Sequence, residues 1–139
     1  MGDLRLRAAD ADDLCVIAAV LQDARAPLNE MVFSPAEGRF MAAFTRRRRE
    51  LGAEATATCL SVLRLDGVQA VRWRGLSPGR PEAEHVVLTL MAESPEHLLL
   101  IFQAGEAIRF EVEGIDVHLE DFVPGRRPAA RSGGERSLA

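Results

Sequence analysis

Between residues 31 and 112, the chain consists of short runs of strand-forming residues separated by turn-forming residues; the runs at 86–91 and 98–102 are mainly apolar, as in buried strands, whereas apolar and polar residues alternate at 108–112. A period of two is typical of strands that bury one face. Short connections between consecutive strands favour antiparallel pairing, and Asp66-Gly67 is the strongest hairpin signal. The expected strands are residues 4–6, 31–33, 40–45, 59–65, 68–74, 86–91, 98–102 and 108–112.

One segment near the start has helical periodicity instead. Asp10 can cap its N-terminus, and Asp12 and Asp13 then lie in the first turn, where the helix dipole favours negative charge. Pro27 ends the helix at the latest. One apolar stripe recurs at helical spacing: Leu14, Ile17, Ala18 and Leu21.

The two strands around Asp66-Gly67 change their apolar face along their length. Leu65 and Val68 are apolar next to the turn, whereas Val71 and Trp73, further away, belong to the opposite face. A strand that bends or carries a bulge can do this, as at the corner of a small barrel. We therefore expect an α+β fold. It has an N-terminal β–α lead-in, a curved antiparallel sheet or small barrel of about seven strands (a pleckstrin-homology-like roll), and a C-terminal helix.

Residues 113–122 allow two interpretations. Ile115, Leu119 and Phe122 have helical spacing, whereas Ile115, Val117 and Leu119 alternate as in a strand. We favour the helix, because a strand ending at Gly114 already completes the expected sheet. Residues 1–123 then form a single globular domain, and residues 124–139 form a flexible tail rich in Arg, Ser and Gly.

The charge balance disfavours nucleic acid as a partner. The chain has 139 residues and a net charge of −4, and all of its 17 basic residues are arginines. Residues 1–123 hold 13 arginines and 20 acidic residues, a net charge of −7, which repels DNA and RNA on average.

The cysteines and the apolar runs favour the cytoplasm. Cys15 and Cys59 are isolated in apolar contexts, so we expect reduced core residues of a cytoplasmic protein. The longest apolar stretch, residues 98–102, is far shorter than a membrane span, and the first residues do not resemble a signal peptide.

Two arginine-rich motifs are candidate anion- or partner-binding sites. The first is a run of four positive charges, which can bind phosphate, nucleic acid or an acidic protein face, although a solvated loop is the simpler interpretation. This run consists of Arg46, Arg47, Arg48 and Arg49.

The second motif is Arg72-Trp73-Arg74. A tryptophan between arginines can stack on a base or anchor a protein partner. Alternation, however, turns Trp73 away from both arginines, toward the core or the mouth of a barrel.

No arrangement of residues predicts catalysis, a metal site or a cofactor. His85, His97 and His118 lie on separate expected elements, without the spacing of metal ligands. No nucleophile-elbow motif or glycine-rich phosphate loop is present in the sequence, and the acidic residues between 111 and 121 are typical of a solvated face.

Four segments resemble the family called domain of unknown function 2948, small uncharacterised bacterial proteins. They are residues 4–24, 31–40, 65–76 (with Leu65-Asp66-Gly67-Val68 and Arg74-Gly75-Leu76) and 105–119, and together they cover most of residues 3–122. The resemblance implies a compact cytoplasmic domain and supports a helix at residues 115–122. It implies no reaction, cofactor or catalytic residue. The chain departs from the family at residues 45–49, where an aromatic-bearing strand end is expected instead of four arginines.

We therefore expect a non-catalytic cytoplasmic binding module for a protein partner or for a second copy of the chain. One alternative is a small anionic-ligand or enzyme site at an open end of the sheet, with Arg72, Arg74 or Arg109 holding the anion. Another is weak single-stranded nucleic-acid binding through the loop of residues 46–49, which the acidic core disfavours.

Overall fold

The computed structural model describes residues 4–52 and 57–122, so the expected tail at residues 124–139 lies outside the described residues. The described part contains ten strands, one α-helix and two short 3₁₀ turns. In chain order these are β1 (Arg5–Ala8), α1 (Ala11–Leu21), β2 (Arg25–Pro27), η1 (Leu28–Glu30), β3 (Met31–Ser34), β4 (Arg39–Arg47), η2 (Arg49–Leu51), β5 (Thr58–Asp66), β6 (Val68–Arg74), β7 (Glu84–Ser94), β8 (His97–Phe102), β9 (Ala107–Val112) and β10 (Val117–Phe122).

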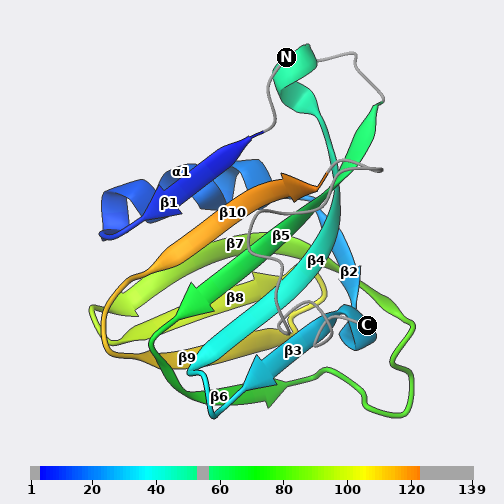
Figure 1. Cartoon of the computed structure of the whole chain (residues 1–139). Helices are drawn as coiled ribbons and strands as arrows, with labels where there is room; N and C mark the ends of the chain where they lie inside the picture. Colours follow the sequence, from blue (N-terminus) through cyan, green and yellow to red (C-terminus); the bar gives the residue numbers. More distant parts are fainter. Residues whose placement is uncertain (1–3, 53–56, 123–139) are drawn as a thin grey trace.

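All the strands belong to one antiparallel sheet that folds over on itself (Figure 1). The strand order is β1-β10-β5-β4-β2-β7-β8-β9-β6, with β3 paired to β4 beside this path. The short strand β2 joins the two halves, because it pairs with β4 on one side and β7 on the other. The halves enclose the core, where the rings of Phe40 on β4 and Phe110 on β9 meet edge to face at a centroid distance of 4.8 Å.

The helix α1 packs against β1 and β7, as Figure 1 shows for β1. The predicted cap is confirmed: the Asp10 side chain accepts a hydrogen bond from the backbone N–H of Asp13 at 2.8 Å. The predicted apolar stripe is buried at Leu14, Ile17 and Leu21. No helix within the described ranges has the length and apolar composition needed to cross a bilayer.

The expected pleckstrin-homology-like α+β roll of about seven strands with a C-terminal helix is wrong. The fold is mostly β, and the segment expected to form the last helix is the strand β10, with Val117 and Leu119 buried. It pairs with β1 on one side and β5 on the other. The local sequence of residues 113–122 fits a helix as well as a strand. The strand forms because the edges of β1 and β5 carry backbone N–H and C=O groups that need partners, and a helix cannot supply them. The strand β2 was also missed, because it is three residues long and ends in Pro27.

The predicted hairpin at Asp66-Gly67 is also wrong, although both strands lie where the alternation placed them. The strand β5 pairs with β4 and β10, and β6 pairs with β9. Gly67 has a φ of +70° and forms a corner at which the chain passes from one half of the sheet to the other. The expected irregularity is present just beyond the corner, where the β6–β9 register shifts between Val68 and Ala70.

Replacing Gly67 with alanine tests the corner. The left-handed region is about 1–2 kcal/mol less favourable for a residue with a Cβ than for glycine. Gly67→Ala should therefore lower the free energy of unfolding by about that amount. Gly79→Ala is the matched control, because Gly79 has no positive φ and a Cβ there would meet only Ser77 Oγ, at an ordinary contact distance of 3.8 Å. Urea denaturation should show the control within about 0.5 kcal/mol of the parent protein. If the two substitutions lowered the free energy of unfolding equally, the claim that Gly67 is required by its positive φ would be contradicted.

Candidate functional site

The arginine run begins inside the molecule. Arg46 is only 3 % exposed and follows Phe44 on the inner face of β4. Its Nη2 donates to both carboxylate oxygens of Asp121, at 3.1 and 3.0 Å. Its Nη1 and Nη2 donate to the two carboxylate oxygens of Glu50, each at 3.0 Å. Its Nε donates to Ser61 Oγ at 2.9 Å, and this hydroxyl donates in turn to Asp121 at 2.6 Å.

The hydrogen bonds of this network keep Arg46 and Glu50 ionised at one end of the core. Burial alone would lower the pKa of the Arg46 guanidinium, but the hydrogen bonds to Glu50 and Asp121 raise it overall. The hydrogen bonds from Arg46 lower the pKa of the Glu50 carboxyl to about 2. Asp121 also accepts a hydrogen bond from the backbone N–H of Leu4 at 3.0 Å. The network therefore connects β4, β5 and β10 to the start of β1, and Arg46 has a structural role.

Arg49 contacts the C-terminal end of α1. Its Nη2 donates to the backbone carbonyls of Ala19 at 2.8 Å and Gln22 at 3.4 Å, and its Nη1 lies 3.8 Å from Asp23. A cation is favourable there, because the last carbonyls of a helix are unpaired and carry partial negative charge. The last turn of α1 contains no basic residue, so Arg49 supplies the missing charge from a distant part of the chain.

A pocket of about 280 Å³ lies where the end of α1 meets β2, β4 and β5. Its charged lining residues are Asp23 and four arginines, Arg25, Arg46, Arg47 and Arg49. The structure thus brings three members of the predicted run together with Arg25, which sequence reasoning missed because β2 was not recognised. The remaining member, Arg48, lies outside the lining and pairs with Glu50 at 3.4 Å.

The second predicted motif lies apart from this pocket, on β6 at the end of the strand order. Trp73 is 41 % exposed, and its ring lies 6.0 Å from that of the buried Phe40. Arg72 and Arg74 are exposed, and Arg72 Nε lies 3.9 Å from a carboxylate oxygen of Glu111. In the part of the chain that the structure describes, β6 pairs only with β9, so its outer edge is open.

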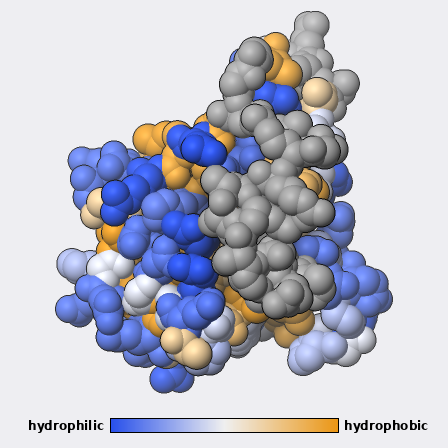
Figure 2. All heavy atoms as spheres, in the orientation of Figure 1, coloured by the Kyte–Doolittle hydropathy of each residue, from blue (hydrophilic) through white to orange (hydrophobic). Residues whose placement is uncertain are grey.

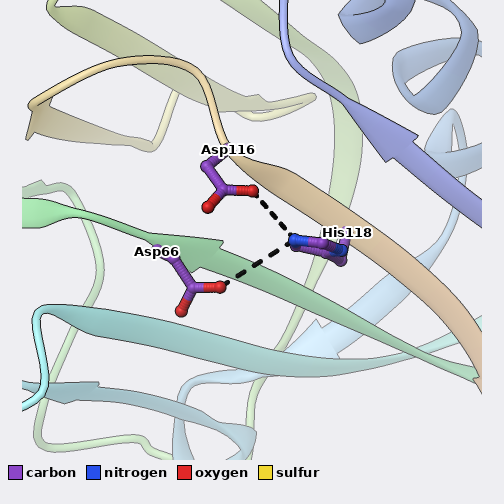
Figure 3. Close-up of side chains that lie close together, drawn as sticks. All are labelled: Asp66, Asp116 and His118. Carbon is purple, nitrogen blue, oxygen red and sulfur yellow. Dashed lines mark hydrogen bonds and ion pairs between the residues drawn. The ribbon is translucent and has the colours of Figure 1, made fainter.

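One cluster combines two carboxylates with an imidazole. Asp66, Asp116 and His118 place one potential ligand atom each within 4.8 Å of one another. Figure 3 shows both carboxylates directed at the imidazole, with His118 Nε2 at 2.9 Å from Asp116 and 3.9 Å from Asp66. Such a set can ligate a divalent cation when its negative charge is available.

The surrounding arginines have already neutralised this charge. Asp66 accepts hydrogen bonds from Arg39 at 2.8 Å and Arg64 at 3.0 Å, and Arg7 lies 3.6 Å from Asp116. Three guanidinium groups beside two carboxylates repel a cation, so we assign the cluster to an ion-pair network on the outer face of β5 and β10. Figure 2 shows this side of the molecule as mainly hydrophilic, with hydrophobic areas separated from one another.

His85 and Glu106 form a second pair of ionisable groups, largely buried. His85 Nδ1 hydrogen-bonds to a Glu106 carboxylate oxygen, and the ring lies 5.6 Å from that of Phe102. Burial alone would raise the pKa of Glu106, but the hydrogen bond from His85 and backbone donors lower it overall. His85 Nε2 and Glu106 Oε1 have no hydrogen-bond partner within residues 4–52 and 57–122. The pair connects the start of β7 to the start of β9.

The two cysteines are free, but only one resembles the expected core residue. Cys15 is exposed on α1, so its expected burial is wrong. Burial raises the pKa of the Cys59 thiol, although the charge of Arg46 partly opposes this. The Cys59 thiol therefore stays protonated at neutral pH and is a weak nucleophile.

A family model described as "protein of unknown function (DUF2948)" matches residues 4–132, nearly the whole chain. The chain belongs to this family. The resemblance found in the sequence is therefore confirmed. No match was found among curated proteins or among solved structures. The DUF2948 assignment brings no reaction, cofactor or partner, so any function must be argued from the geometry.

Replacing Arg46 with alanine should leave Asp121 buried without its counter-charge. Removing one partner of a buried ion pair costs about 3–5 kcal/mol, and Arg46→Ala should lower the free energy of unfolding by that much. Arg47→Ala is the matched control, because the neighbouring Arg47 is exposed, and it should stay within about 0.5 kcal/mol. Urea denaturation at neutral pH measures both. Similar losses in the two variants would contradict the structural role of Arg46.

The network also makes stability depend on pH. The pKa of Glu50 is about 2 in the folded protein, against 4.5 for the free side chain, so its ionised form favours folding. This contribution is complete above roughly pH 5 and is lost as the pH falls toward 2. Glu106, whose pKa is also lowered, acts in the same direction. The urea midpoint should therefore fall on acidification, and Glu50→Gln should reduce this fall. An identical pH profile in the variant would contradict the assignment.

Proposed function

We propose that this DUF2948 protein is a cytoplasmic, non-catalytic binding module, and that it binds an extended segment of a partner protein along the outer edge of β6. The observation that carries the proposal is an open strand edge bearing a half-exposed tryptophan. The free thiols of Cys15 and Cys59 are consistent with a reducing compartment.

The backbone of β6 can bind an extended peptide irrespective of the peptide's side chains. An edge strand presents unpaired N–H and C=O groups, and an extended peptide can pair with them as an added strand. The strand β3 is open in the same way, since it pairs only with β4 in the described ranges. The backbone N–H of Val68 donates to the carbonyl of Gly38 at 2.9 Å, so the turn after β3 holds the start of β6. The edge is therefore anchored at one end.

Trp73 and its neighbours supply the selectivity. Tryptophan and arginine are the residues most enriched among those that dominate interface energies. Phe40 supports the Trp73 ring from below, while Arg72 and Arg74 project on the other face of the strand. We therefore assign an acidic, extended segment as the partner.

The arginines also disfavour a second copy of this chain as the partner. If β6 paired antiparallel with its own copy, two pairs of exposed guanidinium groups would come together on the same side of the joint sheet. Like charges directly opposite each other in a sheet are destabilising. A partner with carboxylates at alternate positions avoids this repulsion.

Selection of short random peptides on the immobilised protein tests the proposal. The selected peptides should be acidic, and their binding should change the fluorescence of Trp73, the only tryptophan. Trp73→Ala should weaken binding by about thirtyfold, the loss typical of a dominant interface residue. Leu88→Ala is the control, because Leu88 is comparably exposed, at 46 %, but lies on β7.

Hydrogen exchange then locates the bound peptide. Binding should protect backbone amides of residues 68–74, because an added strand forms hydrogen bonds with the open edge. Arg72→Glu/Arg74→Glu should favour basic peptides over acidic ones. Peptides that bind Trp73→Ala as well as the parent protein, or that protect only amides outside β6, would refute the proposal.

A further inference from the structure

The arginine pocket at the end of α1 is separate from β6, and its guanidinium groups are not all equally available. Arg46 is engaged by Asp121 and Glu50, and Arg49 by the last carbonyls of α1. Arg49 is therefore held in place at the pocket, while the Arg46 side chain points to the opposite, inner face of β4. They retain their positive charge but have few donors left for a ligand.

Arg25 and Arg47 are the available cations. Arg25 Nε lies 4.0 Å from a carboxylate oxygen of Glu84, and both side chains are about half exposed, so this pair is weak. Arg47 is exposed and has no ion pair with a described residue. The side chains of Arg25 and Arg47 can therefore turn toward a ligand with little loss of existing contacts.

The strand register places hydroxyl groups beside these two arginines. Arg25 is the cross-strand partner of Thr45, and Arg47 is the partner of Thr58. Directly opposed residues lie on the same face of a sheet, and Thr45 and Arg47 are two positions apart on one strand. All four side chains therefore share one face and line the pocket together.

We infer that this pocket binds the phosphate group of a small phosphorylated molecule. A tetrahedral oxyanion has several acceptor oxygens, which match two guanidinium forks and two hydroxyl donors. Asp23 is the only carboxylate that lines the pocket in the described ranges, and Arg49 lies 3.8 Å from it. The volume of about 280 Å³ lies just below the usual range for ligand pockets, which restricts the ligand to a small molecule. This inference does not depend on the peptide site at β6.

Titration calorimetry at constant ionic strength tests the inference, with inorganic phosphate, glucose 6-phosphate and glucose as probes. One or both phosphate probes should bind saturably at millimolar concentrations, and glucose should not. The two phosphate probes distinguish a site for the free ion from a site for an ester. Arg25→Gln/Arg47→Gln should weaken binding at least about tenfold, since hydrogen bonds to charged groups contribute that much.

The matched control is Arg7→Gln/Arg80→Gln, which removes the same charge from two exposed arginines outside the pocket lining. The control should bind phosphate as the parent protein does, and circular dichroism should show that both double variants are folded. Amide shifts on phosphate addition should centre on Thr45 and Thr58. The absence of saturable phosphate binding, or an equal loss in both double variants, would overturn the inference.

Discussion

The buried pair of Arg46 and Asp121 is the constraint on which one end of the sheet depends. Two charges removed from water are stable only when their remaining donors and acceptors are also satisfied. Here Ser61, Glu50 and the backbone of Leu4 satisfy them. These partners come from segments far apart in the sequence, so β1, β10, β5 and β4 must adopt one register before the network can close. The network therefore selects the register as well as contributing to stability.

The positions of most strands could be predicted from the sequence, because alternation is a local property of a half-buried strand. Their pairing could not. The dipeptide Asp66-Gly67 indicates only that the backbone adopts a positive φ at this point. A positive φ is compatible with a corner between two sheet halves as well as with a hairpin turn. Likewise, the spacing within residues 113–122 fits a strand or a helix until the open edges of β1 and β5 are considered. Both errors concern partners that are distant in the chain.

The arginine network, by contrast, left a local signal that was not used. The inward positions of β4 include Phe40 and Phe44, and the same parity continues to Arg46. On β5 and β10 the same rule places Ser61 and Asp121 at the ends of inward-facing rows. Three neighbouring strands thus end their inward-facing positions with a basic, a hydroxyl and an acidic residue. This pattern indicates a buried polar network. Treating the four arginines as one uniform loop concealed this difference in parity.

The same parity explains how an acidic protein can present a positive pocket. Neighbouring residues of a strand face opposite sides, so Arg46 is neutralised inside while Arg47 stays available outside. The net charge of −4 governs attraction over long distances, which salt screens beyond about 8 Å. A small ligand inside the pocket lies within this screening distance of the guanidinium groups. Its binding therefore depends on these groups and not on the net charge of the protein. The overall charge therefore argues against broad binding to nucleic acids but does not argue against a local phosphate site.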